Sequence, residues 1–190
     1  MYNIVYMSEA EIQRIVRKPL SDADLRHVLG SDQKIIQYSD LATFPTLNDL
    51  LPKPTDDCII LYEQEDDSGH WVALLKYGNT VEYFDPYGNK WDAPLAWNSR
   101  GKNQELGQSM KYLSGLLERT ALKRIYSPYH FEKMSNKVNT CGSHCAHRIY
   151  RLRHDNMDLH DYYGYMEDAE EKVHASPDEV VAEFVDSFGI

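Results

Sequence analysis

Cysteine is scarce in this sequence, and long apolar runs are missing. The 190 residues include three cysteines, Cys58, Cys141 and Cys145, which are too few to build a disulfide framework. Their odd number leaves at least one thiol free, which is typical of a protein in a reducing compartment. No apolar segment approaches the roughly eighteen residues of a membrane span, and residues 1–6 lack the basic and apolar layout of a signal peptide. We therefore expect a protein that is neither secreted by that route nor in contact with a membrane.

Basic residues are in the minority. The chain has 30 acidic against 20 basic residues, and its formal net charge is −10. A nucleic-acid-binding surface needs clustered Lys and Arg to neutralise phosphates, so this balance argues against a broad one. Three arginines, Arg148, Arg151 and Arg153, are the candidate for a local basic patch. The remaining composition, with 42% hydrophobic and 26% charged residues, is that of a globular domain.

Apolar spacing and turn residues predict an α+β domain in which helices precede and follow a central sheet. Capping boxes begin helices at Ser8 and Ser176, and Ser21 caps another helix that Gly30 ends. Further helices are expected at 46–50, 104–118, 141–153 and 159–166. Strands are expected at 35–38, 58–62, 70–77, 80–85 and 122–126. The segment 86–103, rich in Gly, Pro and Asn, is expected to form a long surface loop.

A predicted hairpin brings a histidine close to an aspartate. A two-residue Gly-Asn turn joins the strand at 70–77 to the strand at 80–85, so the two strands should pair antiparallel. The start of the first strand then lies beside the end of the second, which makes His70 and Asp85 neighbours at one edge of the sheet. A carboxylate in that place can hold an imidazole in the tautomer that a general base needs. An ordinary surface His–Asp pair would give the same pattern.

Cys141 lies where a polar, irregular segment gives way to a predicted helix. The positive end of a helix dipole lowers the pKa of a thiol, and the free N–H groups there can stabilise an oxyanion. Gly142 would leave room for a substrate backbone. A cysteine at a helix start is also common as an inert core residue, so the position alone does not identify a nucleophile. Cys145, one turn later, and Cys58, in an apolar strand, are expected to face the core.

Three short blocks resemble the catalytic blocks of the adenovirus-type maturation proteases. They read Gly69-His-Trp-Val-Ala, Tyr83-Phe-Asp-Pro-Tyr-Gly88 and Thr140-Cys-Gly-Ser-His-Cys145. The order His, acid, Cys matches, as do the aromatic after the histidine, the acid-Pro-aromatic-Gly turn and the Cys-Gly-x-x-Cys spacing. Similar enzymes occur in large DNA viruses, virophages and Polinton-type elements, and they share their fold with proteases of ubiquitin-like proteins. The blocks span 69–145, while residues 1–55 and the tail match nothing that we can name.

The resemblance implies an α+β, papain-like or adenain-like cysteine protease fold, with a central mixed sheet packed between helices. The nucleophile would lie at the N-terminus of a buried helix. It implies Cys141 as the nucleophile, His70 as general base and acid, and Asp85 as the partner that orients His70, with no cofactor or metal ion. Family members favour small residues, often glycine, around the scissile bond. Residues expected to contact the substrate are Trp71, Tyr83, Tyr87 and Gly142.

The family pattern is broken at the side chain that stabilises the oxyanion. The family has a glutamine six or seven positions before the cysteine, where this chain has Ser135 and Met134. Asn136, five positions before the cysteine, could supply an equivalent amide, and Asn139 is a second candidate. The backbone N–H of Cys141 should contribute in any case.

The remaining histidines are not expected to have a catalytic role. A zinc site made of Cys141, Cys145, His144 and His147 is disfavoured, because structural zinc sites usually use two separated pairs of ligands. Four histidines are expected at the surface or in contact with partners: His144, His147, His154 and His160.

Together these observations predict a cysteine endopeptidase with a Cys-His-Asp triad, a viral maturation protease that cleaves capsid or other virion precursors. It would form one domain over 1–190, with a helical part at 1–55, the catalytic core at 56–154 and C-terminal helices at 155–190. Two alternatives are a processing protease for ubiquitin-like modifiers and a catalytically inactive binding relative, the latter suggested by the missing glutamine. We expect a monomer in the virion and host cytoplasm. Adenoviral enzymes of this type are stimulated by DNA and a viral peptide, but the charge of −10 argues against a DNA requirement here.

Overall fold

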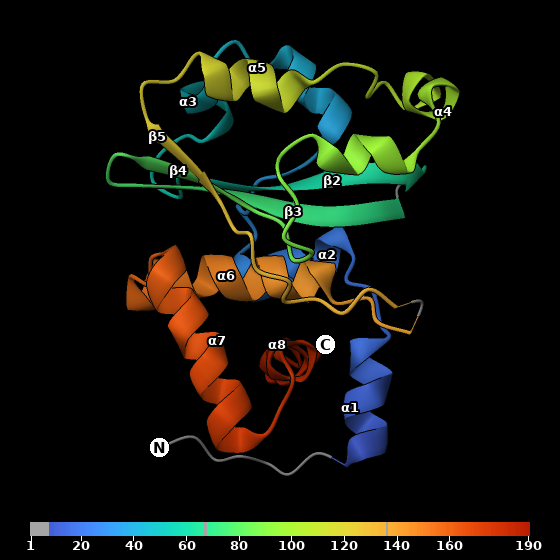
Figure 1. The fold of residues 1–190 in the computed structure, drawn as a ribbon, viewed down its shortest axis with the longest axis vertical. Helices are drawn as coiled ribbons and strands as arrows, with labels where there is room; N and C mark the ends of the chain where they lie inside the picture. The colour runs from blue at the N-terminus through green and yellow to red at the C-terminus, as the bar shows by residue number, and fades with distance from the viewer. Residues whose placement is uncertain (1–7, 67, 136) are drawn as a thin grey trace.

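The computed structural model describes residues 8–66, 68–135 and 137–190, which fold around a five-stranded mixed sheet (Figure 1). The strands follow the order β1-β2-β3-β4-β5. β2, β3 and β4 pair antiparallel, whereas β1 and β5 run parallel to their neighbours at the two edges. The strands are β1 (Ile35–Gln37), β2 (Asp57–Glu65), β3 (Ser68–Tyr77), β4 (Thr80–Phe84) and β5 (Lys123–Tyr126). The predicted central mixed sheet is therefore confirmed.

Helices cover both faces of the sheet (Figure 1). One layer contains α1 (Glu9–Val16), α2 (Asp22–Leu29), α6 (Cys141–Asp155), α7 (Leu159–Val173) and α8 (Pro177–Asp186). The other contains the 3-10 helices η1 (Tyr38–Thr43) and η2 (Ala93–Trp97) with α3 (Leu47–Leu50), α4 (Arg100–Glu105) and α5 (Tyr112–Glu118). Within the first layer, α6 packs directly against β3 and also contacts α2 and α8.

The central strand β3 separates two apolar cores. Because successive side chains of a strand point to opposite faces, Trp71 and Ala73 pack with the α6 layer, whereas Val72 and Leu74 pack with the α5 layer. A strand that is buried on both faces reads as a continuous apolar run. Burial of β3 on both faces fixes the position of its first residues relative to the first residues of α6.

Two of the predicted elements are wrong in part. The segment 86–103 contains η2 and the start of α4 instead of an extended loop. The helix expected at 104–118 begins at Tyr112, because the chain after α4 turns through Gly107 at φ +68°. Glycine adopts this left-handed conformation readily and it ends a helix. Met110, placed by its spacing on the apolar face, is 62% exposed.

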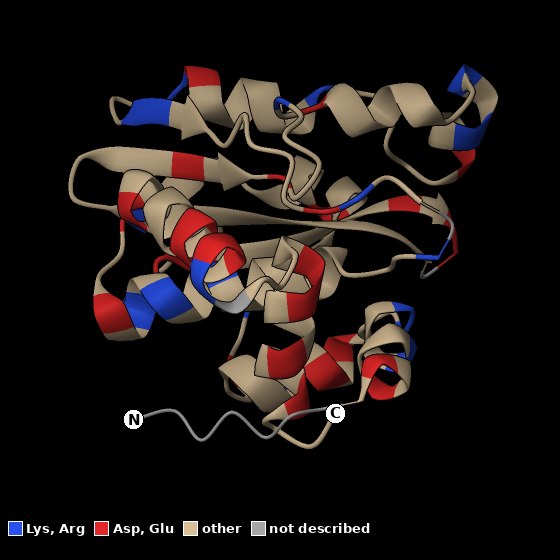
Figure 2. Cartoon of the chain, turned by 60° about the horizontal axis from the view of Figure 1, so that its bottom comes forward, with Lys and Arg blue, Asp and Glu red and all other residues tan. Residues whose placement is uncertain are grey.

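The three arginines considered as a candidate basic patch near the end of α6 do not form one, because they bind acidic side chains. Arg148 is fully buried and donates to both carboxylate oxygens of Glu82 in β4, at 2.8 and 2.7 Å. Arg153 makes the same kind of bidentate ion pair with Asp57 of β2. In Figure 2 the basic residues lie in small separate groups, with acidic residues among them. None of the described helices is both long enough and apolar enough to cross a membrane.

Candidate active site

His70, Asp85 and Cys141 come from three different elements and meet at one edge of the sheet. His70 lies near the start of β3, Asp85 directly follows β4, and Cys141 is the first residue of α6. The imidazole Nε2 of His70 lies 2.8 Å from Oδ1 of Asp85, and both side chains are buried. Nε2 therefore donates to the carboxylate, and Nδ1 keeps the lone pair that can accept a proton.

The sulfur of Cys141 lies beside this pair. Its Sγ, one imidazole nitrogen of His70 and one carboxylate oxygen of Glu132 all lie within 4.8 Å of one another. The structure thus brings the three predicted residues together and adds Glu132 to them. Among the described residues, no other three His, Cys, Asp or Glu side chains bring their donor atoms as close together, so no separate metal centre is found there.

Aromatic rings cover the imidazole. The pairing of Ala73 with Phe84 places Tyr87, rather than Asp85, opposite His70 if the register is continued. The ring of Tyr87 accordingly stacks on His70 at 4.7 Å and 10°, and its backbone N–H donates to Oδ1 of Asp85 at 2.8 Å. Trp97 meets His70 edge-on at 5.1 Å and is 38% exposed. Sequence reasoning missed Trp97 because it lies in the segment expected to be a surface loop.

The other expected substrate contacts differ in their surroundings. Trp71 is 9% exposed, and its Nε1 donates to the carbonyl of Leu20 at 3.1 Å. A Cβ on Gly142 would lie 3.1 Å from Leu20 and 3.2 Å from Trp71, so the close approach at this glycine is made by the protein's own side chains. Tyr83 is buried in the core on the α5 side, which is the opposite face of the sheet.

Cys141 keeps part of its surface exposed, but the largest influence on its thiol is still desolvation by the surrounding protein. Desolvation raises the pKa of the thiol to about 12, and the nearby Glu132 acts in the same direction. The backbone N–H groups of Trp71 and Gly142 lower the pKa, but less. A helix dipole contributes about 0.3–1 kcal/mol, which is less than one pKa unit. The thiol is therefore neutral at rest, contrary to the expectation from its position, and the thiolate must form by transfer of the proton to His70.

The N-terminus of α6 presents backbone N–H groups. Thr140, the residue before the helix, makes no side-chain cap. Its hydroxyl instead donates to Asp178 of α8. The N–H groups in the first turn of a helix have no intrahelical partner, so those of Cys141 and Gly142 are available beside the sulfur.

Of the two amides expected to stabilise an oxyanion, the structure describes only that of Asn139. Asn136 lies outside the described residues. The Asn139 side chain donates to the carbonyl of Arg17 at 2.9 Å. Met134 is 69% exposed, and the hydroxyl of Ser135 accepts the N–H of Lys137.

Glu132 is an acidic residue beside Cys141 and His70 that sequence reasoning did not identify. The backbone N–H groups of Phe131 and Glu132 both donate to the carbonyl of Pro86, at 2.9 and 3.0 Å, which ties this segment to the Asp85–Tyr87 turn. The Glu132 side chain is 3% exposed, and burial raises the pKa of its carboxyl group to about 8. It stands nine positions before Cys141, outside the spacing of the family glutamine, so no sequence signal pointed to it.

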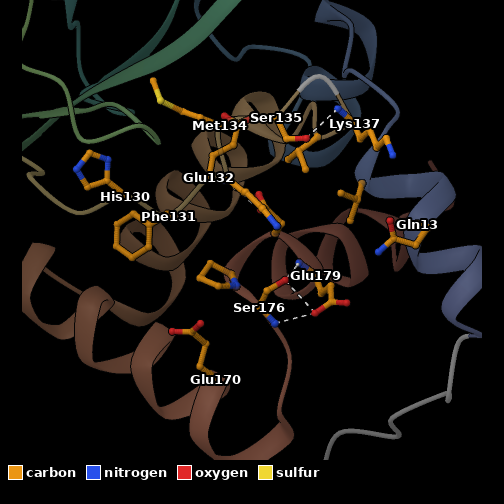
Figure 3. Close-up of a pocket in the computed structure, with 15 residues that line it drawn as sticks. Gln13, His130, Phe131, Glu132, Met134, Ser135, Lys137, Glu170, Ser176 and Glu179 are labelled. Atoms are coloured by element: carbon orange, nitrogen blue, oxygen red, sulfur yellow. Dashed lines mark hydrogen bonds between the residues drawn. The ribbon is translucent and has the colours of Figure 1, made fainter.

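A cavity of about 640 Å³ lies next to this site (Figure 3). It opens between α1, α7, α8 and the segment before α6, and Glu132 is part of its wall. Neither His70 nor Cys141 lines it. The cavity is therefore distinct from the position at which the sulfur would attack a substrate carbonyl.

Two histidines expected at the surface are buried, and two cysteines are buried as predicted. His144 is bonded to Asp178 at 3.2 Å, and His147 to the hydroxyl of Tyr162 at 2.9 Å. Both histidines are 0% exposed. Cys58 and Cys145 are likewise 0% exposed, which confirms that they face the core.

The fold and the site define an α+β protein with a buried His–Asp pair beside a cysteine that starts a helix. No family model matches the chain. It is 30% identical over 172 residues to the uncharacterized protein V9 of Sputnik virophage, a match that covers 90% of this chain and 96% of V9. The chain therefore belongs to the same family as V9.

Two solved structures resemble the chain more distantly. One is the central domain of the uncharacterized Lpg1148 protein from Legionella pneumophila, with 14% identity and a TM-score of 0.42, covering 90% of this chain and 99% of that chain. The other is the pS273R protease of ASFV, with 14% identity and a TM-score of 0.47, covering 90% of this chain and 67% of that chain. Both scores are below 0.5, so neither structure decides the fold or activity of this chain.

Proposed function

We propose that this chain is a cysteine endopeptidase, a viral maturation protease that cleaves capsid or other virion precursor proteins. The observation that carries the proposal is the buried His70–Asp85 pair, whose imidazole lies next to Cys141 at an uncapped helix start. An inert core cysteine would need neither an oriented imidazole nor free N–H groups beside its sulfur.

In the first half of the reaction, His70 takes the proton of the Cys141 thiol on Nδ1 as the sulfur attacks the substrate carbonyl carbon. The carbonyl electrons move to the oxygen, which the N–H groups at the start of α6 can stabilise. Asp85 holds the imidazole and stabilises its positive charge. The C–N bond then breaks, the amine leaves with the proton from His70, and a thioester remains on Cys141.

In the second half, a water molecule attacks the thioester. His70, neutral again, removes a proton from that water as the new C–O bond forms. The C–S bond breaks, Cys141 recovers the proton from His70, and the carboxylic acid product leaves. Trp97 and Tyr87 lie over the imidazole and would keep bulk water from it during both halves.

The viral part of the proposal is supported by the relationship to V9 of a virophage. We propose that it acts as a monomer in the virion and host cytoplasm and needs no DNA. At low salt, duplex DNA should leave the cleavage rate unchanged, and strong stimulation would contradict this.

The proposal is tested by co-expressing the chain with the capsid precursor of the same virus and measuring the masses of the products. The wild type should give shortened products, whereas Cys141→Ala and His70→Ala should leave the precursor intact. His160→Ala, which changes an exposed histidine, is the matched control and should cleave as the wild type does.

Other outcomes would point to the alternatives. Rapid turnover of fluorogenic ubiquitin-like substrates, with the precursor left intact, would indicate a protease of ubiquitin-like modifiers. Identical processing by the wild type and Cys141→Ala, together with a Cys141 thiol that iodoacetamide does not alkylate, would indicate an inactive binding protein.

A further inference from the structure

The two oxygens of the Glu132 carboxyl group have different surroundings. Oε1 accepts the backbone N–H of Thr140 at 3.0 Å. Oε2 is buried and accepts no hydrogen bond of ordinary geometry among the described residues, although the phenol of Tyr87 lies close enough to favour the ionised carboxyl group. A buried polar atom without a partner is costly, and such atoms are found where a ligand or a reacting group completes them. Figure 3 shows Glu132 among the residues that line the cavity.

Glu132 lies where its carboxyl group can contact the oxygen of a substrate carbonyl that Cys141 attacks. One of its carboxyl oxygens lies within 4.8 Å of both the Cys141 sulfur and an imidazole nitrogen of His70. When sulfur bonds to a carbonyl carbon, the oxygen on that carbon comes to lie about 2.6 Å from the sulfur, and its donors must stand 2.7–3.1 Å away from the oxygen. A donor on the Glu132 carboxyl group can therefore meet that oxygen while Cys141 holds the carbon.

The charges around Glu132 decide whether it carries a proton. The ionisable groups that face it from neighbouring elements are His70 in β3, Asp85 and Tyr87 after β4, Cys141 in α6 and Asp178 in α8. Burial, with Asp178 and Asp85 adding to it, raises the pKa of Glu132 to about 8, although the N–H of Thr140 and the phenol of Tyr87 act against this. At neutral pH the side chain is therefore mostly a carboxylic acid with an O–H to donate.

We propose that Glu132 is a catalytic residue whose protonated carboxyl group donates a hydrogen bond to the oxyanion formed when Cys141 attacks the substrate. This inference rests on the proposed peptidase function. As the S–C bond forms, the carbonyl electrons move to the oxygen, and Glu132 keeps its proton while it donates. As the C–N bond breaks, the same electrons restore the carbonyl, and the amine leaves with the proton from His70.

The acid form matters for the thiol as well. An ionised Glu132 raises the pKa of Cys141, so it opposes the thiolate that attacks. The proton on Glu132 thus lets the side chain donate to the oxyanion, and it also removes a negative charge that would oppose the thiolate. Both effects are lost as the pH rises past about 8. A glutamine at this position would donate through its amide at any pH.

The test compares Glu132→Ala and Glu132→Gln with the wild type on a fluorogenic peptide that ends in Gly-Gly-aminomethylcoumarin, and on the matching peptide aldehyde as an inhibitor. Glu132→Ala should lower kcat about 100-fold to 1,000-fold with little change in KM, and weaken the aldehyde to a similar degree. Glu132→Gln should keep kcat within about tenfold of the wild type, and the alkaline fall in kcat, near pH 8 in the wild type, should move to higher pH. Glu170→Gln, which alters an exposed glutamate of the same cavity wall, should change nothing.

The possible failures are distinguishable. If the wild type cleaves and Cys141→Ala does not, but Glu132→Gln loses as much kcat as Glu132→Ala or keeps the alkaline fall near pH 8, Glu132 is not the donor. A fully active Glu132→Ala would overturn the inference equally. If the wild type neither hydrolyses the peptide nor binds the aldehyde, and matches Cys141→Ala in both, the peptidase proposal fails and the inference fails with it.

Discussion

The substitution Glu132→Gln should change how the stability of the folded protein depends on pH, whatever the protein cleaves. Glutamine has the shape of the protonated glutamic acid, so it can keep the bond from the Thr140 N–H and donate where the acid donates. It cannot ionise. The wild type and the variant therefore share every other titrating group, and the difference between their unfolding free energies isolates Glu132.

The sign and size of the effect follow from the two pKa values of Glu132. The pKa is 4.5 in the absence of the fold and about 8 within it. Between these values the unfolded chain is ionised while the folded protein keeps the proton, so stability is complete below pH 4.5 and falls as the pH rises toward 8. Each pH unit in this window costs about 1.4 kcal/mol, which gives about 3 kcal/mol at pH 7.

Urea unfolding of both proteins at pH 5, 6, 7 and 8 measures this difference. The unfolding free energy of Glu132→Gln should exceed that of the wild type by an amount that grows with pH, by about 1.4 kcal/mol per unit. Glu170→Gln should follow the wild type throughout. A difference that stays constant from pH 5 to 8 would show that Glu132 ionises normally in the folded protein, and the reasoning about the buried acid would be refuted.

Three further predictions concern other parts of the molecule. Asp85→Asn should keep the fold but lower kcat by about 10²–10⁴-fold, because the amide no longer favours the Nε2–H tautomer of His70; an unchanged kcat would remove Asp85 from the mechanism. Glu82→Ala should lower the unfolding free energy by about 3–5 kcal/mol, because it leaves the fully buried Arg148 guanidinium unpaired; denaturant titration measures this, and the double variant Glu82→Leu/Arg148→Met should recover most of the loss. Burial lowers the pKa of His144 and holds that of His147 well below 6.5, so the unfolding free energy should fall as the pH drops below 6.5, by about 1.4 kcal/mol per unit for His147. Measured in the Glu132→Gln protein, His147→Gln should reduce that slope, and an unchanged slope would contradict the buried neutral state.

Local sequence signals predicted much of the fold because they act over short distances. The capping boxes at Ser8 and Ser176 are formed as expected. The two-residue turn after Tyr77 set the pairing of β3 with β4, and that pairing brought His70 near Asp85. These contacts depend on residues close together in the chain, so spacing alone identified them.

The parts that sequence reasoning missed depend on long-range contacts. Glu132 reaches the site because its segment binds the carbonyl of Pro86, 46 positions earlier, and the irregular segment has no period that reveals this. Trp97 covers His70 only because the segment after β4 folds back as η2. The pKa of Cys141 was expected to be low from its helix position, but burial by the tertiary structure outweighed the dipole.

The most direct test of the central claim is the site-resolved rate at which iodoacetamide alkylates each cysteine at pH 7.5, read by mass spectrometry in the wild type and His70→Ala. If His70 activates Cys141, the wild type should be labelled at Cys141 and not at the buried Cys58 and Cys145, and His70→Ala should react at least about tenfold more slowly. A Cys141 that reacts equally in both proteins, or no faster than the two buried cysteines, would contradict the claim that it is the nucleophile.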